Sequence, residues 1–204
     1  MNERLGAARK LGVMVILVVL TLAGTHCGSS TSTGQAGSIK VVAGENFWGS
    51  IAAQLGGSKA NVQSVVSDPN ADPHEYESST NDARAFADAD FVILNGAGYD
   101  DWGQKLLAAN PSSHRQLLTV AELLGKKAGD NPHFWYDPEY VVRIADQITT
   151  SYKVIDSADA AYFDQQRAAL ASALKPYLDR IAEIRTKFGG RPVGSTESIF
   201  VYMA

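Results

Sequence analysis

The sequence has one cysteine among its 204 residues, Cys27, and no basic patch stands out in the body of the chain. A single cysteine cannot close a disulfide within the chain, so it needs another explanation. The formal net charge of −4 and the missing basic patch argue against a protein that binds nucleic acids. No repeat of the solenoid type is present. Hydrophobic residues make up 45% of the chain and charged residues 20%, which is the balance of an ordinary globular protein.

The first 27 residues have the pattern of an export signal. Three basic residues, Arg4, Arg9 and Lys10, precede an apolar run from Leu11 to Ala23. This run is shorter than the about 20 residues that span a membrane, which favours a signal over a transmembrane helix. Cys27 lies just after the run. A lipid attached to a new N-terminal cysteine at this position would hold the protein on the outer face of the membrane.

The residues before Cys27 leave alternatives to lipid attachment open. Residues 23–26 read Ala-Gly-Thr-His, whereas lipoprotein signals prefer Leu three positions before the cysteine and Gly or Ala directly before it. Cleaved secretion to the periplasm and an uncleaved anchor are the other two interpretations. Residues 28–38 are rich in Ser, Thr and Gly and are predicted to form a flexible tether.

Apolar runs of strand length alternate with stretches of helical periodicity from residue 39 onward. The predicted strands are Ile39–Ala43, Val62–Val66, Phe91–Leu94 and Leu117–Val120. The predicted helices are Phe47–Leu55, Thr80–Ala87, Trp102–Ala109 and Glu139–Tyr152, the last with Pro138 at its first position. This alternation predicts an α/β fold with a mainly parallel sheet and flanking helices. In such sheets, ligands bind in loops beyond the carboxyl ends of the strands.

A long helix is predicted from Ala158 to Phe188, with Pro176 inside it as a candidate kink. About 30 helical residues would span about 45 Å, which is longer than the preceding lobe needs. Gly189-Gly190 closes the helix, and residues 192–195 are predicted to begin a new strand. The predicted domains are a first lobe over residues 39–157, a connecting helix over 158–189 and the start of a second lobe over 190–204.

Two loops carry a Pro-His pair among acidic and aromatic residues. The first is Asp72-Pro73-His74-Glu75-Tyr76-Glu77, directly after a predicted strand, and the second is Asn131-Pro132-His133-Phe134-Trp135-Tyr136-Asp137-Pro138. Proline restricts the loop and so helps to place the next side chain before a ligand arrives. His74 and His133 are therefore candidate metal ligands, although a hydrogen-bonded loop histidine is the other interpretation of each. His26 lies beside the signal cleavage region and His114 in an exposed loop, and neither is predicted to bind metal.

These two loops, together with the segment from Ala87 to Gly96, resemble the metal-specific solute-binding proteins of bacterial ABC importers, the TroA-like family. The resemblance runs from about Ile39 to Ala204. It implies two α/β lobes joined by one long helix, with a metal ion held between the lobes. It assigns His74 and His133 as ligands from the first lobe and Glu197 as the third ligand. The other interpretations of Glu197 are an exposed loop acid and an acid near a helix N-terminus, where the helix dipole favours it. The family's fourth ligand, usually an Asp later in the second lobe, has no counterpart in this sequence.

The ligand set leaves the metal open between zinc and manganese, with iron as a further alternative. Two imidazoles suit zinc, whereas carboxylates favour harder ions such as manganese. The resemblance implies a monomeric, extracytoplasmic receptor that delivers the ion to a membrane permease without catalysing a reaction. An adhesin or a passive metal buffer is the alternative function. A zinc hydrolase is disfavoured because the sequence has neither a His-Glu-x-x-His motif nor a serine or cysteine nucleophile motif.

The part of the sequence assigned to the second lobe is short. About one strand and a turn are too little for a hydrophobic core, so we expect the long helix to expose an apolar face. We also expect a frayed segment after Gly190 and weak metal binding. A fragment, a frameshift and a true end of the protein are all compatible with the sequence.

Overall fold

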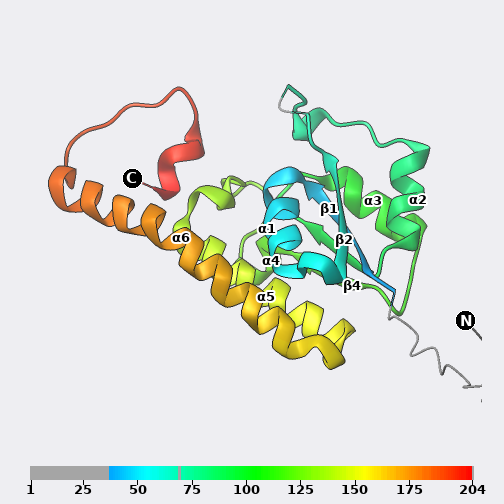
Figure 1. Cartoon of the computed structure of the whole chain (residues 1–204). Helices are drawn as coiled ribbons and strands as arrows, with labels where there is room; N and C mark the ends of the chain where they lie inside the picture. The colour runs from blue at the N-terminus through cyan, green and yellow to red at the C-terminus, as the bar shows by residue number, and fades with distance from the viewer. Residues whose placement is uncertain (1–36, 69, 204) are drawn as a thin grey trace, which may run out of the picture. The chain divides into compact units, whose positions relative to one another are not determined.

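The computed structural model describes residues 37–68 and 70–203 (Figure 1). The predicted export signal, including His26 and Cys27, lies outside these residues, as does most of the predicted tether over 28–38. Among the described residues, no helix is both long and apolar enough to cross a membrane.

Four strands form a parallel sheet in the order β2-β1-β3-β4. The strands are β1 (Ile39–Glu45), β2 (Ala60–Val66), β3 (Phe91–Leu94) and β4 (Gln116–Thr119). The register places Ile39 beside Ala60, Val41 beside Phe91 and Phe91 beside Gln116. The predicted parallel α/β fold is confirmed. Every residue of β3 is buried, as expected for a central strand covered on both faces.

Helices cover both faces of the sheet (Figure 1). They are α1 (Asn46–Gly56), α2 (Thr80–Asp88), α3 (Asp101–Ala109), α4 (Val120–Leu124), α5 (Pro138–Ile155) and α6 (Ala160–Phe188). Val41 and Ile93 pack with α1, α4, α5 and α6 in one apolar cluster. Val42 and Leu94 pack with α2 and α3 in a second cluster. Alternate residues of a strand point to opposite faces, so the sheet divides the core into two layers.

The helix starts follow local capping signals in the sequence. Ser79 caps α2 and forms a capping box with Asp82, and Asp137 caps α5, whose first residue is Pro138. These caps satisfy backbone N–H groups that have no partner in the first helical turn. Val120, predicted as the last residue of a strand, instead begins α4.

The predicted long helix is α6, which continues through Pro176 to Phe188. Its first half packs on the lobe, where Phe163 is fully buried and Leu170 is 5% exposed. Its second half leaves Ile184 and Phe188 half exposed, which agrees with the expected apolar face.

The strand predicted over residues 192–195 is wrong, because this segment has no regular secondary structure. Pro192 cannot donate a ladder hydrogen bond and Gly194 weakens a strand. A strand also needs a partner, and none of the described residues pairs with this segment. The chain instead continues into a short 3₁₀ turn, η5 (Ser198–Tyr202). Glu197 therefore precedes a helical turn and does not follow a strand.

Candidate metal centre

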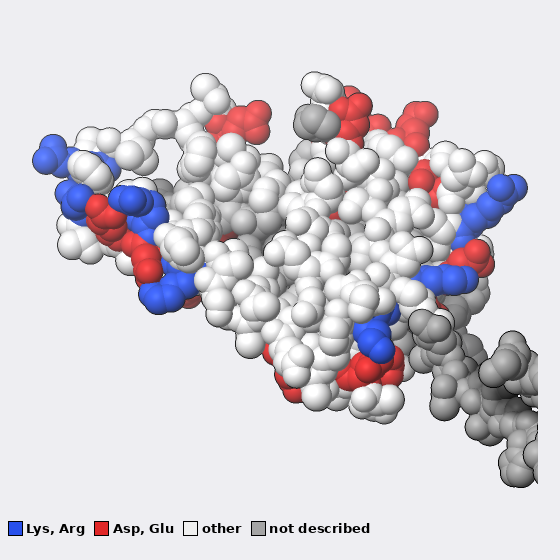
Figure 2. Space-filling view, viewed as in Figure 1, with Lys and Arg blue, Asp and Glu red and all other residues white. Residues whose placement is uncertain are grey.

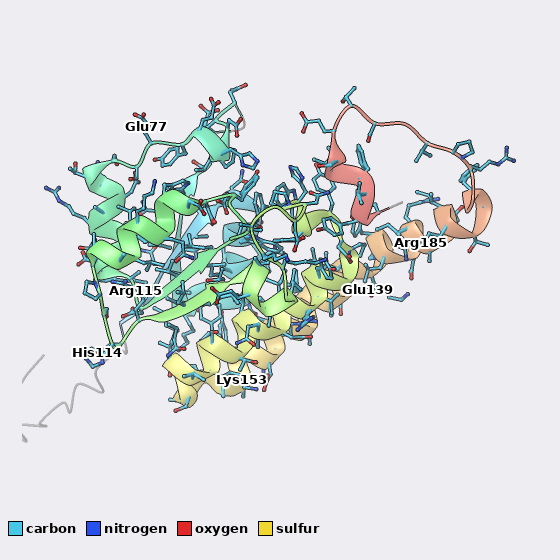
Figure 3. All side chains as sticks on the ribbon, turned by 180° about the vertical axis from the view of Figure 1, so that it is seen from behind. Glu77, His114, Arg115, Glu139, Lys153 and Arg185 are labelled. Atoms are coloured by element: carbon cyan, nitrogen blue, oxygen red, sulfur yellow. The ribbon has the colours of Figure 1, made fainter. Side chains whose placement is uncertain are left out.

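The two Pro-His loops lie on the same side of the lobe. The loop after β2 contains the 3₁₀ turn η2 (Pro73–Glu75), in which the backbone N–H of His74 donates to the Asp72 carboxylate over 2.9 Å. The second loop places His133 directly before the turn η3 (Phe134–Tyr136). Figure 3 shows Glu77, from the first loop, at the end of the lobe opposite to His114. The structure thus separates His114 from the candidate site.

Tyr99, from the loop after β3, packs against both candidate histidines. Its ring centroid lies 4.4 Å from that of His74 and 6.0 Å from that of His133. Trp135 packs against Tyr99 at 5.4 Å and stacks on Phe47 at 3.8 Å. This aromatic group supports the two imidazoles from one side and restricts where they can turn.

Burial and a neighbouring histidine make His133 easier to deprotonate. Its pKa lies below the ordinary 6.5, chiefly because burial disfavours the charged imidazolium and also because His74 is near. Glu197 acts in the opposite direction and favours the charged form. A lowered pKa keeps the ring neutral at pH 7, and a neutral imidazole is the form that binds metal ions.

Glu197 is exposed and lies on the segment that folds back from the end of α6. Its backbone carbonyl accepts a hydrogen bond from the Ser195 hydroxyl over 2.7 Å. The following turn, η5, packs on η3 through Phe200 against Tyr136 and through Tyr202 against Phe134. This packing brings Glu197 to the side of the lobe that carries His133.

The three predicted ligands are neighbours, but they do not form a coordination sphere. Within residues 37–68 and 70–203, no three His, Cys, Asp or Glu side chains are close enough together to hold a metal ion. A hollow of about 180 Å³ beside Pro73 is lined by Glu45, Asp68, Tyr99 and Trp135, among others. The arrangement presents two imidazoles and one carboxylate that would have to move together around an ion.

Acidic residues flank the first candidate ligand, His74, in the sequence. Figure 2 shows acidic side chains at the edge that bears the loop after β2, whereas residues 189–203, after α6, contain one acid, Glu197. The exposed acids of the loop after β2 are Asp68, Asp72, Glu75 and Glu77. Clustered negative charge raises the local concentration of cations, which suits an entry surface for a divalent metal ion.

Two carboxyl groups are buried, that of Glu45 at the end of β1 and that of Asp100 in the loop after β3. Asp100 accepts hydrogen bonds from the backbone N–H groups of Asn95 and Gly96 over 2.6 and 2.7 Å. Neither carboxyl oxygen of Glu45 has a hydrogen-bond partner among the described residues. The pKa of Glu45 is raised well above its ordinary value, chiefly by burial and also by the negative charge of Asp100. The pKa of Asp100 is raised as well, chiefly by burial, while its backbone N–H donors act to lower it. These donors favour negative charge on Asp100 over Glu45, whose oxygens have no such donors among the described residues.

Replacing Glu45 with Gln is expected to remove a loss of stability that the wild type shows as pH rises. Because the folded-state pKa of Glu45 is raised, the folded chain keeps a proton that the unfolded chain releases above about 4.5. The contribution of Glu45 to stability is therefore complete below that pH and falls as pH rises. The neutral amide of the Glu45→Gln variant has no proton to release. Urea denaturation of both proteins across pH should show that the free energy of unfolding of the variant rises relative to that of the wild type as pH rises.

The matched control for this experiment is Glu77→Gln, which changes an exposed carboxyl. Changes to exposed side chains usually stay within about 0.5 kcal/mol, so this variant should change the free energy of unfolding little. Parallel profiles for Glu45→Gln and the wild type would contradict the raised pKa of Glu45.

Three contributors to the site were missed by the interpretation of the sequence. Glu45 follows the apolar run Val41–Gly44 at the end of β1, and a charged residue that ends such a run is a signal of a special environment. Tyr99 follows Asn95 to Gly98, which reads only as a turn. Asn131 directly precedes a recognised Pro-His pair, but its contact with a distant segment cannot be inferred from spacing.

Comparisons with known proteins place the chain in a family. Residues 41–204 match the family described as "Zinc-uptake complex component A periplasmic". The manganese ABC transporter substrate-binding lipoprotein PsaA of Streptococcus mitis is 26% identical over an alignment that covers 96% of this chain and 68% of PsaA.

Solved structures of similar fold include the lipoprotein YcdH of Bacillus subtilis, with a TM-score of 0.74, 17% identity and coverage of 81% of this chain. The Zn(II)-bound ZnuA-like domain of Streptococcus pneumoniae AdcA has a TM-score of 0.70, 20% identity and coverage of 82%. This chain spans 63% of the length of each of these two structures. Since the family match covers most of the sequence and the fold agrees, the chain belongs to the ZnuA family of periplasmic zinc-uptake components.

Proposed function

We propose that the protein captures a divalent metal ion, Zn²⁺ or Mn²⁺, outside the cytoplasm and delivers it to the membrane permease of an ABC importer. The observation that carries this proposal is the placement of His74 and His133 around one tyrosine ring. Glu197 lies near enough to influence the charge of His133. The proposed roles are two imidazole ligands from one lobe and one carboxylate ligand from the segment after α6.

The donor set is compatible with both metals. Imidazole nitrogen suits zinc and carboxylate oxygen suits manganese, while zinc generally binds such mixed sites more tightly. The name of PsaA refers to manganese and the AdcA domain holds Zn(II). We therefore propose a site that accepts either ion, with selectivity set by the ligands that complete the coordination.

The proposed activity is capture and transfer by a monomer, with no catalytic step. Family membership as a substrate-binding component supports the permease as partner. We further propose that a lipid on Cys27 tethers the protein to the outer face of the membrane. Partition of the full chain into a detergent phase tests this proposal.

Metal-free protein is expected to gain stability when Zn²⁺ or Mn²⁺ is added. A ligand present at 100 times its dissociation constant stabilises a folded protein by about 2.7 kcal/mol. Thermal denaturation after chelator treatment, with each metal added back, measures this gain. Mg²⁺ is the control, because it prefers an octahedral set of oxygen ligands and should leave the midpoint unchanged. No shift with either Zn²⁺ or Mn²⁺ would refute the proposed function.

A further inference from the structure

One amide side chain connects His133 to the segment that carries Glu197. The Asn131 side-chain nitrogen donates to the Ser198 carbonyl over 2.7 Å, and its oxygen lies 2.6 Å from Nδ1 of His133. The same oxygen accepts the backbone N–H of His133 over 3.2 Å. The backbone carbonyl of Asn131 also accepts the Tyr202 hydroxyl over 2.6 Å. A single residue therefore contacts both parts of the candidate site.

These contacts fix the orientation of the amide and the position of a proton on the imidazole. A backbone carbonyl only accepts hydrogen bonds, so the NH₂ group of Asn131 has to face Ser198. Its oxygen then faces Nδ1 of His133, and this nitrogen has to carry the proton. The lone pair of the neutral ring is consequently on Nε2, which is the atom left to bind an ion.

We infer that Asn131 is a positioning residue that couples the orientation of His133 to the docking of residues 198–202. Its oxygen selects the Nδ1–H form of the ring, and its NH₂ group holds the turn that follows Glu197. An ion that draws on both His133 and Glu197 would meet ligands whose relative position this amide sets. The consequence for metal affinity rests on the proposed function, whereas the form of the ring does not.

Two further contacts hold this turn against the lobe without involving Asn131. Tyr202 packs on Phe134 with ring centroids 6.0 Å apart, and the ammonium of Lys126 lies 5.7 Å from the centroid of the Tyr202 ring. Residues 198–202 thus have their own apolar and cation–π contacts with the lobe. Asn131 adds the polar connection that reaches the imidazole.

Two variants separate the two functions of the amide. Asn131→Asp keeps an acceptor for His133 but cannot donate to the Ser198 carbonyl. We expect the Nδ1–H form to persist, while hydrogen exchange at residues 198–203 becomes faster. Asn131→Ala removes both connections, so the ring should also populate the Nε2–H form. Nitrogen-15 NMR of the histidine rings in metal-free protein, at a pH where they are neutral, measures the first readout.

Metal titration supplies a third readout beside the form of the ring and the hydrogen exchange at residues 198–203. Removing a group that orients a metal-binding histidine typically weakens affinity about 10- to 100-fold, and we expect this loss for Zn²⁺ with Asn131→Ala. Asn61→Ala alters an exposed asparagine at the amino end of β2 and should change none of the three readouts. Tyr202→Phe should speed exchange at residues 198–203 and leave the Nδ1–H form intact.

Two results would overturn the inference. One is an Nε2–H ring at His133 in the metal-free wild type. The other is a ring form and a metal affinity that stay unchanged in Asn131→Ala. If the wild type shows the Nδ1–H ring but binds neither Zn²⁺ nor Mn²⁺, the positioning of the ring stands and the proposed function fails.

Discussion

Replacing His133 with Ala is expected to lower the affinity for Zn²⁺ by more than about 100-fold. Loss of a group that only orients a metal ligand already weakens binding about 10- to 100-fold, and His133 is proposed to be a ligand itself. His133 also lies near both other proposed ligands, since His74 lowers its pKa and Glu197 raises it. Isothermal titration of metal-free protein with Zn²⁺ and with Mn²⁺ measures the loss.

Two further histidine variants make this result interpretable. His74→Ala should show a loss of similar size, because it removes the other imidazole packed on Tyr99. His114→Ala changes a histidine at the opposite end of the lobe (Figure 3) and should bind metal as the wild type does. An affinity for His133→Ala that equals that of His114→Ala would contradict the ligand assignment.

The parallel sheet could be predicted from the sequence because its signals are local. Buried strands such as Phe91–Leu94 are continuous apolar runs, and the capping residues Ser79 and Asp137 mark the starts of the helices that follow. Once strands alternate with helices, the carboxyl-end rule places the loop of His74 on the ligand-binding side. The fold and one side of the candidate site thus follow from short-range patterns.

The rest of the site depends on contacts between residues far apart in the chain. Asn131 and Ser198 are separated by 67 positions, and no periodicity indicates that they meet. The effect of Asp100 on the charge of Glu45 likewise arises only when the end of β1 and the loop after β3 are brought together. The strand wrongly predicted over residues 192–195 shows the same limit, since strand formation is decided by a pairing partner and not by local apolar character alone.

The position of α6 is also a property of tertiary packing. The apolar pattern of residues 158–188 predicts a helix but does not say which part of it is covered. In the structure Phe163 stacks on Tyr152 with ring centroids 5.1 Å apart. Tyr152 in turn donates to the Ala52 carbonyl over 2.9 Å. These contacts join α6 through α5 to α1.

Replacing Phe163 with Ala is expected to lower the free energy of unfolding by about 3 to 5 kcal/mol, the usual cost of truncating a buried Phe. Phe163 is fully buried, so the variant loses apolar burial and leaves a cavity beside Tyr152. Urea denaturation of the metal-free chain measures the change. Phe188→Ala is the matched control on the same helix, because Phe188 is 57% exposed and surface changes usually stay within about 0.5 kcal/mol.

Equal effects of the two substitutions would show that α6 is not held by its first half. A large effect confined to Phe163 would instead locate the attachment of α6 at its N-terminal end. That distinction bears on the metal site, because α6 leads to the segment carrying Glu197. If Phe163→Ala also weakens Zn²⁺ binding while Phe188→Ala does not, the attachment of α6 contributes to where this carboxylate lies relative to His133.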